Sequence, residues 1–240
     1  MYSIRFPHSG QFEYADRRLS AREILELVEP YLTPERRERI RRVVESRTCD
    51  VVPVLENIYD RGNISAVLRS AEAMGFQCAH VIELGEKFKS ANRVTQGADK
   101  WLDVRRWRST RDCITELKRQ GFKIVATHLD QKAKPISSID FLGPVAVVFG
   151  NEKDGISQEM VELADETMII PMAGFVQSFN ISVAAAISFY HIYLERQRAH
   201  GHVGNLSEEE KLVLRADFCL RSSDNPDRLI RELLERQLKA

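Results

Sequence analysis

The 240-residue sequence predicts an α/β fold, with a mainly parallel sheet and helices on both faces. From Val51 onward, short β-rich runs alternate with segments of helical pattern, and this alternation is typical of parallel sheets. The run VAVVFG at 145–150 predicts a buried strand that ends at a glycine turn. Helical patterns before residue 48 and after residue 206 predict flanking helices.

The first flanking helix follows an irregular start. Residues 1–19 show no clear period and are expected to form a loosely held arm. Ser20 and Glu23 then form a capping box, which predicts a helix that ends at Pro30.

The second flanking helix is basic. Thr33 is the expected N-cap and Pro34 occupies the first helical position. Six arginines and two glutamates lie between Arg36 and Arg47. We therefore expect residues 1–48 to form an arm with basic helices that suit the phosphates of a nucleic acid, RNA or DNA.

The central region, residues 49–200, is expected to hold the sheet. Strands are predicted at 51–56, 78–84, 122–129, 145–150 and 167–171, with a short one near 102–106. Helices are predicted at about 63–75, 110–120, 157–163 and 180–198. Asn63 is the expected N-cap of the first of these helices.

A helical extension, residues 201–240, is predicted after a polar linker. Ser207 and Glu210 form a second capping box, and the pattern at 225–237 predicts one more helix. Neither helix can bury its apolar face alone. We expect both to pack on the α/β domain or across a dimer.

The composition excludes several classes of protein. The 35 basic and 35 acidic residues cancel, which argues against a uniformly basic coat. The four cysteines are far apart, with no CxxC pair, so we expect reduced thiols and no metal site: Cys49, Cys78, Cys113 and Cys219. No run of eighteen apolar residues and no signal segment occur, so we expect a cytoplasmic protein without membrane contact.

Two of the expected strand ends carry polar groups. After the strand at 51–56, the stretch ENIYDRGNISAVLR places Asn63 and Arg69 on the next helix. After the strand at 145–150, Glu152 follows the Gly150 turn. Ligands of parallel sheets bind at such carboxyl ends. The alternatives are a capped helix with a surface arginine and a solvated turn, and neither stretch is a phosphate loop or dinucleotide fingerprint.

A third polar cluster follows the last strand. The segment IPMAGFVQSFNISVAAAI, 169–186, gathers Gln177, Ser178, Asn180 and Ser182 between two apolar elements. An N-cap at Asn180 would satisfy one of these side chains. The others need further partners, which a bound small molecule could supply.

Basic residues are also clustered at 36–47, 105–111 and 194–198, with Lys118 and Arg119 nearby in the sequence. Charge runs are usually solvated faces. Several such clusters, with Trp107 interleaved, favour a face that binds the phosphates of a nucleic acid.

Together the three polar stretches resemble motifs 1, 2 and 3 of the SpoU branch of the SPOUT RNA methyltransferases. The segments GADKWLDVRRW, LKRQGFKIVATHLD and IIPMAGFVQSFNISVAAAI are most similar to the TrmH enzymes, which methylate the 2'-oxygen of a D-loop guanosine in tRNA. The resemblance implies a C-terminal trefoil knot, S-adenosylmethionine as cofactor and a homodimer.

The resemblance also assigns site residues by motif position. The implied catalytic group is Asn63, Arg69, Glu152, Ser178 and Asn180. The implied contacts to S-adenosylmethionine are Thr127, Gly150, Ile170, Met172 and Phe179. We expect the tRNA backbone to be bound by Arg36, Arg39, Arg47, Lys118 and Arg196.

Two positions depart from the family pattern. Arg61 and Gly62 stand where motif 1 usually has a proline, which is expected to loosen that turn. Phe179 stands where motif 3 often has leucine, which is expected to reshape the cofactor pocket slightly.

Several alternatives stay open at this point. Arg69 either removes the proton of the 2'-hydroxyl or stays charged and stabilises the alkoxide. The target is a D-loop guanosine, another tRNA nucleoside or ribosomal RNA. A cofactor-free RNA-binding protein with this fold is a different class of function, and an oxidoreductase with a Rossmann domain is a third, which lacks its glycine fingerprint.

Overall fold

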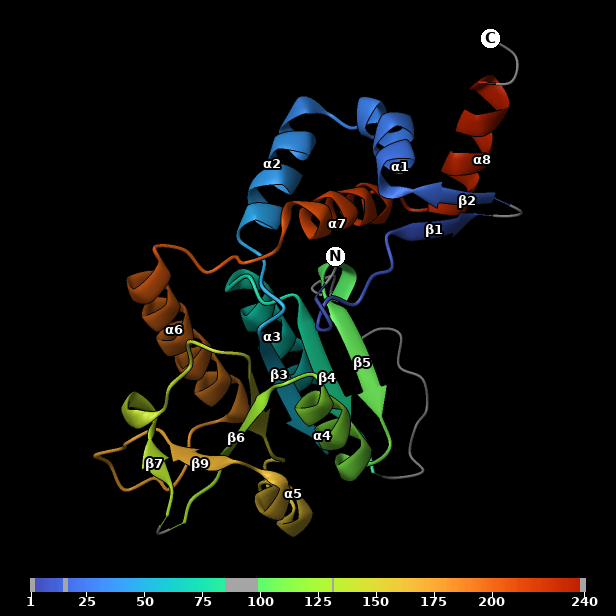
Figure 1. The fold of residues 1–240 in the computed structure, drawn as a ribbon. Helices are drawn as coiled ribbons and strands as arrows, with labels where there is room; N and C mark the ends of the chain where they lie inside the picture. Colours follow the sequence, from blue (N-terminus) through green and yellow to red (C-terminus); the bar gives the residue numbers. More distant parts are fainter. Residues whose placement is uncertain (1–2, 15–16, 85–98, 131, 238–240) are drawn as a thin grey trace. The chain divides into compact units, whose positions relative to one another are not determined.

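A computed structural model describes residues 3–14, 17–84, 99–130 and 132–237 (Figure 1). The chain forms two compact units, Met1–Arg47 with Gly204–Ala240 and Thr48–Val203. The two ends of the chain therefore build one unit together, and the segment between them builds the other. Among the helices of the described residues, none has the length and apolar character that a membrane span requires.

The first unit begins with a β-hairpin, in which β1 (Gln11–Tyr14) pairs antiparallel with β2 (Arg17–Ser20). Phe6 and Leu19 are buried. The expectation of a loosely held arm is therefore wrong for residues 3–14 and 17–19, while residues 1–2 and 15–16 lie outside the described residues. Phe12 pairs with Leu19 across the hairpin, so tertiary pairing compensates for the missing sequence period.

The helices of the first unit start where their capping residues predict. Ser20 and Glu23 form the capping box of α1 (Ala21–Val28), which a short 3₁₀ turn, η1 (Glu29–Tyr31), follows. Thr33 caps α2 (Pro34–Glu45). Each cap satisfies backbone N–H groups that have no partner within the helix.

The C-terminal helices complete this unit. Ser207 and Glu210 form the predicted capping box of α7 (Glu208–Arg221), and α8 (Pro226–Gln237) follows. The helix α7 packs on α1 and α2, and α8 packs on α1 and β1. Their apolar faces are therefore covered by the N-terminal segment, a partner that the sequence analysis did not anticipate.

The second unit is built on one sheet of seven strands in the order β5-β4-β3-β8-β6-β9-β7. Every pairing in it is parallel, as the alternation of elements predicts. The strands are β3 (Val51–Glu56), β4 (Cys78–Ile82), β5 (Asp103–Trp107), β6 (Lys123–Thr127), β7 (Lys134–Pro135), β8 (Val145–Phe149) and β9 (Glu166–Ile169). Only the two-residue strand β7 was not predicted.

Helices cover this sheet on both faces, as predicted (Figure 1). One pair that packs together is α3 (Arg61–Ala73) with α6 (Ile181–His200), and the other is α4 (Thr110–Arg119) with α5 (Gln158–Leu163). Two 3₁₀ turns, η2 (Asp99–Trp101) and η3 (Ile136–Ser138), lie in the connections. Asn180 caps α6 as expected.

The cap of α3 differs from the prediction. The Asp60 carboxylate accepts a hydrogen bond from the backbone N–H of Gly62 at 2.7 Å, so Asp60 is the N-cap. Asn63 instead lies in the first turn and is buried. Its side chain is thus available for contacts outside the helix.

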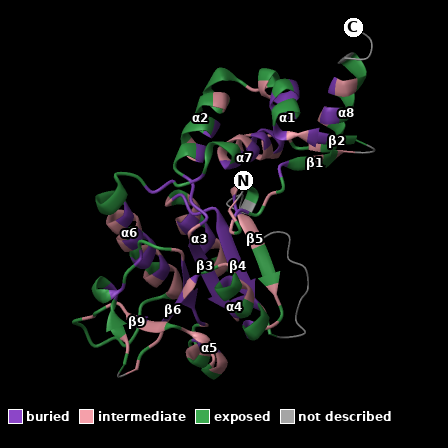
Figure 2. Ribbon diagram, in the orientation of Figure 1, coloured by how far each residue is buried: buried purple, intermediate pink, exposed green. Residues whose placement is uncertain are grey.

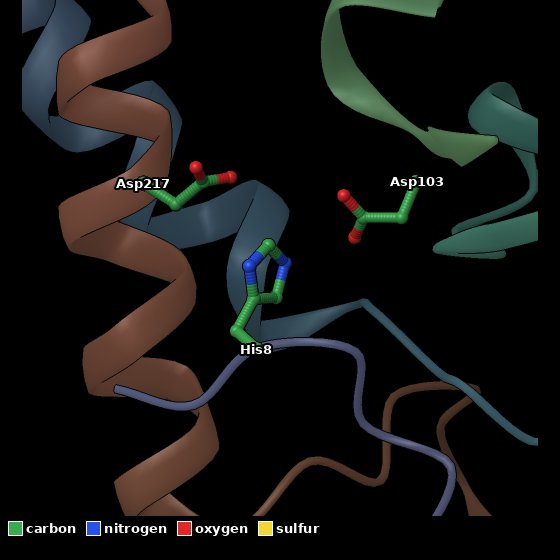
Figure 3. A group of neighbouring side chains, drawn as sticks. All are labelled: His8, Asp103 and Asp217. Atoms are coloured by element: carbon green, nitrogen blue, oxygen red, sulfur yellow. The ribbon is translucent and has the colours of Figure 1, made fainter. Parts of the chain in front are cut away.

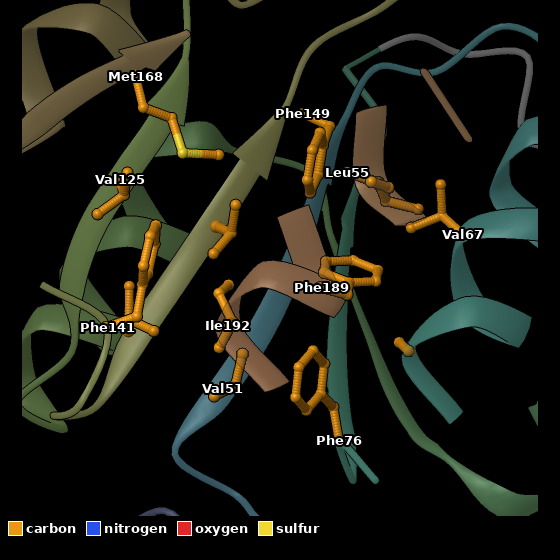
Figure 4. Packing of buried hydrophobic residues seen from close by; sticks show 14 of the residues in the cluster. Val51, Leu55, Val67, Phe76, Val125, Phe141, Phe149, Met168, Phe189 and Ile192 are labelled. Atoms are coloured by element: carbon orange, nitrogen blue, oxygen red, sulfur yellow. The ribbon is translucent and has the colours of Figure 1, made fainter. Parts of the chain in front are cut away.

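Aromatic packing holds α6 to the sheet. The ring of Phe189 makes edge-on contacts with Phe76 and Phe149, at centroid distances of 5.4 Å and 5.7 Å (Figure 4). Figure 2 shows that the central strands β3 and β4 are buried along their length. Cys49, Cys78 and Cys113 are buried free thiols here, and Cys219 is another in the first unit, as expected.

Two arginines expected to bind RNA are buried, and those predictions are wrong. Arg47 is 1% exposed, and its guanidinium lies 5.6 Å from the centre of the Phe218 ring. Arg196 is 3% exposed and donates to the backbone oxygens of Phe141, Leu142 and Gly143 at 2.9–3.3 Å. A charge run in a sequence does not reveal which of its members a fold encloses.

We expect Arg196→Met to destabilise the protein. Arg196 ties α6 to the turn before β8 and lies 3.7 Å from the Asp50 carboxylate. Loss of a buried, hydrogen-bonded charge should lower the free energy of unfolding by about 3 kcal/mol, measured by urea denaturation. Arg198→Met, at an exposed site on the same helix, should change it by less than about 0.5 kcal/mol. Equal effects of the two substitutions would contradict a structural role for Arg196.

Candidate functional site

The order of the strands creates a switch point at the centre of the sheet. From β3 the chain proceeds through β4 to β5 on one side, whereas β8, β6 and β9 lie on the other side. The strands β3 and β8 are direct neighbours, with Leu55 opposite Phe149. The loops that follow these two strands therefore leave the sheet side by side, which is where parallel sheets bind ligands.

The loop after β8 is tightly closed. Asn151 and Gly155 exchange two backbone hydrogen bonds, of 2.9 Å and 3.1 Å. A Cβ atom on Gly150 would lie 2.0 Å from the carbonyl carbon of Gly155, so only glycine fits there. Glu152 consequently lies at the tip of a short loop whose base is fixed.

The carboxylate of Glu152 binds the loop after β3. It accepts hydrogen bonds from the backbone N–H groups of Tyr59 and Asp60, at 3.3 Å and 3.4 Å. It also accepts a 2.7 Å hydrogen bond from Nδ2 of Asn63. Motifs 1 and 2 are thus joined through one side chain.

Motif 3 extends this network. Nδ2 of Asn180 lies 3.4 Å from Oδ1 of Asn63, which accepts its hydrogen bond. Oδ1 of Asn180 meanwhile accepts from the backbone N–H of Ser182 at 2.9 Å, as an N-cap should. Asn63, Glu152 and Asn180, which lie far apart in the sequence, therefore form one connected polar group.

The charge of Glu152 follows from these donors. Partial burial tends to raise its pKa, but the hydrogen bonds from Asn63 and from backbone N–H groups outweigh it and hold the pKa below its usual value. Glu152 is therefore ionised at neutral pH and acts as an acceptor. It also fixes the amide of Asn63, with the oxygen directed toward Asn180.

Two expected catalytic residues are not part of the network. Arg69 is exposed on α3, and Ser178 is exposed on the loop before α6. No hydrogen bond or ion pair of either side chain is formed within the described residues. As far as the described residues show, this cation and this hydroxyl are available to a substrate.

Three of the expected cofactor residues lie at one edge of the sheet. Thr127 ends β6, Gly150 directly follows β8 and Ile170 directly follows β9. Because β6 pairs in parallel with both β8 and β9, these residues leave the sheet together. The Thr127 hydroxyl donates to the backbone oxygen of Val148 at 2.9 Å, which holds the ends of β6 and β8 together.

The loop after β9 carries the other two. Met172 is half-buried and Phe179 is 37% exposed, while the residues between them are exposed. Outside helices and strands, no backbone hydrogen bond of the described residues involves 172–179. Free N–H and C=O groups framed by apolar side chains suit a flat ligand with polar edges, such as adenine.

The remaining residues expected to bind RNA are exposed. Arg36 and Arg39 lie on α2 of the first unit. In the second unit, Lys118 forms a 2.7 Å ion pair with Asp165. In the cluster at 105–111, the Arg105 guanidinium lies 4.0 Å from the centre of the Trp107 ring.

Sequence reasoning missed Glu56, the last residue of β3. It is 1% exposed and accepts three hydrogen bonds, from Thr110 and Ser157. A charged residue that closes an otherwise apolar strand was the available signal, because a buried carboxylate requires donors.

Within the described residues, the side chains of metal-binding type to be considered are His8, Asp103 and Asp217 (Figure 3). His8 and Asp217 belong to the first unit, and Asp103 belongs to the second. A single unit thus offers at most two of these ligands, fewer than the three or more protein ligands of typical zinc sites. We assign no metal to this group.

Comparison with known proteins relates this geometry to a family. Residues 50–190 match the model of the SpoU rRNA methylase family. The tRNA (guanosine(18)-2'-O)-methyltransferase of Escherichia coli K12 is 36% identical over 70% of this chain and 73% of its own length. The Aquifex aeolicus enzyme of the same name is 35% identical over 77% of this chain and 89% of its own.

Solved structures agree with these matches. The A. aeolicus TrmH/SpoU tRNA modifying enzyme has a TM-score of 0.71 at 32% identity, covering 80% of this chain and 98% of that one. An AdoMet-bound rRNA methyltransferase from Sinorhizobium meliloti has a TM-score of 0.55 at 27% identity, covering 67% of this chain and 60% of that one. The matched segment contains β3 to β9 and all three polar stretches of the site. The chain belongs to the SpoU family of RNA methylases.

Proposed function

We propose that the protein is an S-adenosylmethionine-dependent tRNA (guanosine(18)-2'-O)-methyltransferase. The observation that carries this proposal is the polar group of Asn63, Glu152 and Asn180, which joins the three motifs at the switch point of the sheet. The relatives of 35–37% identity that carry this name support the choice of substrate.

The cofactor fits the residues at this edge. S-adenosylmethionine supplies the methyl group, and its adenine matches the free backbone groups of the loop at 172–179. Met172 and Phe179 would provide apolar contacts, and Thr127, Gly150 and Ile170, at the ends of β6, β8 and β9, would lie against the cofactor. Phe179 would give the cofactor an aromatic contact at a position where motif 3 often has leucine.

The catalytic residues act on the ribose 2'-hydroxyl. Glu152 fixes Asn63, and Asn63 together with Asn180 orients the groups around the reacting oxygen. Ser178, exposed beside Asn180 in the chain, offers a hydroxyl to the substrate. Positioning of this kind is a major contribution to a displacement reaction.

Arg69 supplies the positive charge. Its guanidinium is exposed, and no carboxylate of the described residues neutralises it through an ion pair. A guanidinium is normally a hydrogen-bond donor that keeps its proton in proteins. We therefore assign Arg69 to stabilising the forming 2'-alkoxide, while solvent water takes up the proton that the hydroxyl loses.

The trefoil knot is part of this proposal. The strand β9 lies between β6 and β7, although β6 and β7 precede it in the chain. The chain at β9 thus inserts between two earlier segments, an arrangement that is compatible with the proposed knot. General rules of topology make knots rare, so a functional reason is expected, and an enclosed cofactor loop provides one.

A homodimer is supported by the surface of α6. Its buried side packs on the sheet, while Val183, Ile187 and Tyr190 are 45%, 36% and 54% exposed on one stripe of the helix. Phe175 and Val176, on the preceding loop, are 109% and 66% exposed. Exposed apolar side chains gathered in this way are typical of an interface, and we propose that a second copy covers them.

The tRNA backbone is expected to contact Arg36, Arg39 and Lys118. The guanidinium groups on α2 are exposed, and phosphate contacts need such cations. Because tRNA is the proposed substrate, we propose the cytoplasm, where tRNA is used, as the location of the protein.

The function is tested on its product. Purified protein incubated with unmodified tRNA and S-adenosylmethionine should produce 2'-O-methylguanosine at position 18, detected by mass spectrometry of nuclease fragments. Arg69→Ala should lower the single-turnover rate by about 100-fold or more, because one charge that stabilises the transition state is lost.

Binding is the control for this test. Arg69→Ala should bind S-adenosylmethionine and tRNA as the unmodified protein does, by calorimetric titration. Methylation of ribosomal RNA, or of another tRNA nucleoside, would keep the reaction but show that the proposed substrate is wrong. Absence of cofactor binding by the unmodified protein would leave a non-catalytic RNA-binding role, and loss of cofactor binding in the variant would show that Arg69 belongs to the cofactor site.

We expect Ile187→Glu to give a monomer in analytical ultracentrifugation, because a carboxylate cannot be buried in an apolar interface without a partner. Arg198→Glu, at an exposed site on the same helix, should leave the dimer intact. A monomeric unmodified protein would contradict the proposed dimer.

We expect Arg39→Gln to weaken tRNA binding and to reduce the slope of log Kd against log salt by about 0.7–0.9, the effect of one lost phosphate contact. Arg228→Gln removes an exposed arginine already paired with Glu232 at 2.7 Å, and should leave the slope unchanged. An unchanged slope for Arg39→Gln would remove α2 from the RNA surface.

A further inference from the structure

Glu56 is a buried carboxylate to which the proposed chemistry gives no role. It lies at the carboxyl end of β3, is 1% exposed, and accepts three hydrogen bonds of 2.7–2.8 Å. Oε1 accepts from the hydroxyls of Thr110 and Ser157, and Oε2 accepts from the backbone N–H of Ser157. Thr110 begins α4, whereas Ser157 is the N-cap of α5.

The contact with Ser157 leads to the catalytic loop. Ser157 follows Ile156, whose backbone nitrogen lies so near Gly150 that a Cβ there would be 2.1 Å away. Gly155 in turn is bound to Asn151 by two backbone hydrogen bonds. Glu56 therefore fixes the far end of the same closed loop that carries Glu152 at its tip.

The two glutamates bridge the same pair of loops in opposite directions. Glu56 belongs to the β3 side and binds Ser157 at the end of the loop after β8. Glu152 belongs to the loop after β8 and binds Tyr59, Asp60 and Asn63 on the β3 side. With both contacts formed, the loops cannot shift relative to each other without breaking hydrogen bonds to a carboxylate.

A carboxylate that only filled space at this buried position would lower the stability of the fold. A buried charge loses its hydration, and apolar residues fill such positions with less loss of stability. A carboxylate, however, accepts several hydrogen bonds and has no donor of its own. Two hydroxyls and one backbone N–H from two helix starts converge on Glu56, and the N–H among them can only donate.

We propose that Glu56 is a positioning residue, which holds the loop at 150–157 so that Glu152 keeps Asn63 in its catalytic orientation. This inference rests on the proposed function, because its test by kcat requires that the protein methylates tRNA. It goes beyond that function because Glu56 touches neither the substrate nor the cofactor, and acts only through Ser157 and the loop.

The test compares two substitutions that affect different contacts of Glu56. Glu56→Gln keeps the size of the side chain but replaces one carboxylate oxygen with an amide N–H₂ group. That group cannot accept the hydrogen bonds that the replaced oxygen accepted. Thr110→Val removes only the 2.7 Å hydrogen bond to α4 and leaves both contacts with Ser157. Both variants should melt at a lower temperature than the unmodified protein, so stability alone does not distinguish them.

Turnover and amide exchange do distinguish them. At a temperature where both variants are folded, Glu56→Gln should lower kcat for tRNA by about 10- to 100-fold with KM for both substrates nearly unchanged, the effect of a displaced catalytic group. Amide hydrogen exchange should become faster at residues 150–157. Thr110→Val should keep kcat and the exchange rates of this loop.

The outcomes separate the two proposals. Suppose that the unmodified protein methylates tRNA. If Glu56→Gln then keeps the kcat of the unmodified protein, the positioning role is overturned. If Thr110→Val lowers kcat as much as Glu56→Gln does, Glu56 is merely structural and the positioning role is likewise overturned. If the unmodified protein does not methylate tRNA, the proposed function fails. In that case, unchanged exchange at 150–157 in Glu56→Gln overturns the positioning role independently.

Discussion

The parallel pairing of β3 with β8 is the constraint on which the site depends. The two strands are separated in the chain by β4, β5, β6 and β7, yet they are neighbours at the centre of the sheet. This pairing brings the loop with Tyr59 and Asp60 within reach of the Glu152 carboxylate. Asn180 then reaches the same place from the start of α6.

The sequence was sufficient for most of the fold because its signals are local. Buried parallel strands form nearly continuous apolar runs, so β3 and β8 are visible in VVPVLE and VAVVFG. Helix starts depend on one cap and its third neighbour, so Ser20, Thr33 and Ser207 mark them correctly. The hairpin β1–β2 was missed because its stability comes from pairing rather than from a period.

The site was predictable only in part. The resemblance identified Asn63, Glu152 and Asn180, and the structure brings them together. It could not show that Asp60, and not Asn63, caps α3, because both side chains can accept from a helix start. A tertiary contact decides which residue is the cap, since the Asn63 side chain is bound by Glu152 and Asp60 is left to cap the helix. Likewise, the burial of Arg47 and Arg196 depends on Phe218 and on backbone oxygens that no local pattern reveals.

The position of β7 restricts how the sheet can assemble during synthesis. Within the described residues, β7 pairs with β9 alone, and β9 fills the place between β7 and β6. A ribosome makes β7 before β9, so β7 emerges with no edge to join. That side of the sheet cannot be completed in the order of translation, and β7 must wait until the later strand has been inserted beside β6. Such a non-local last step makes folding slow, and it leaves the pairing of β7 with β9 as the last part of the sheet to form.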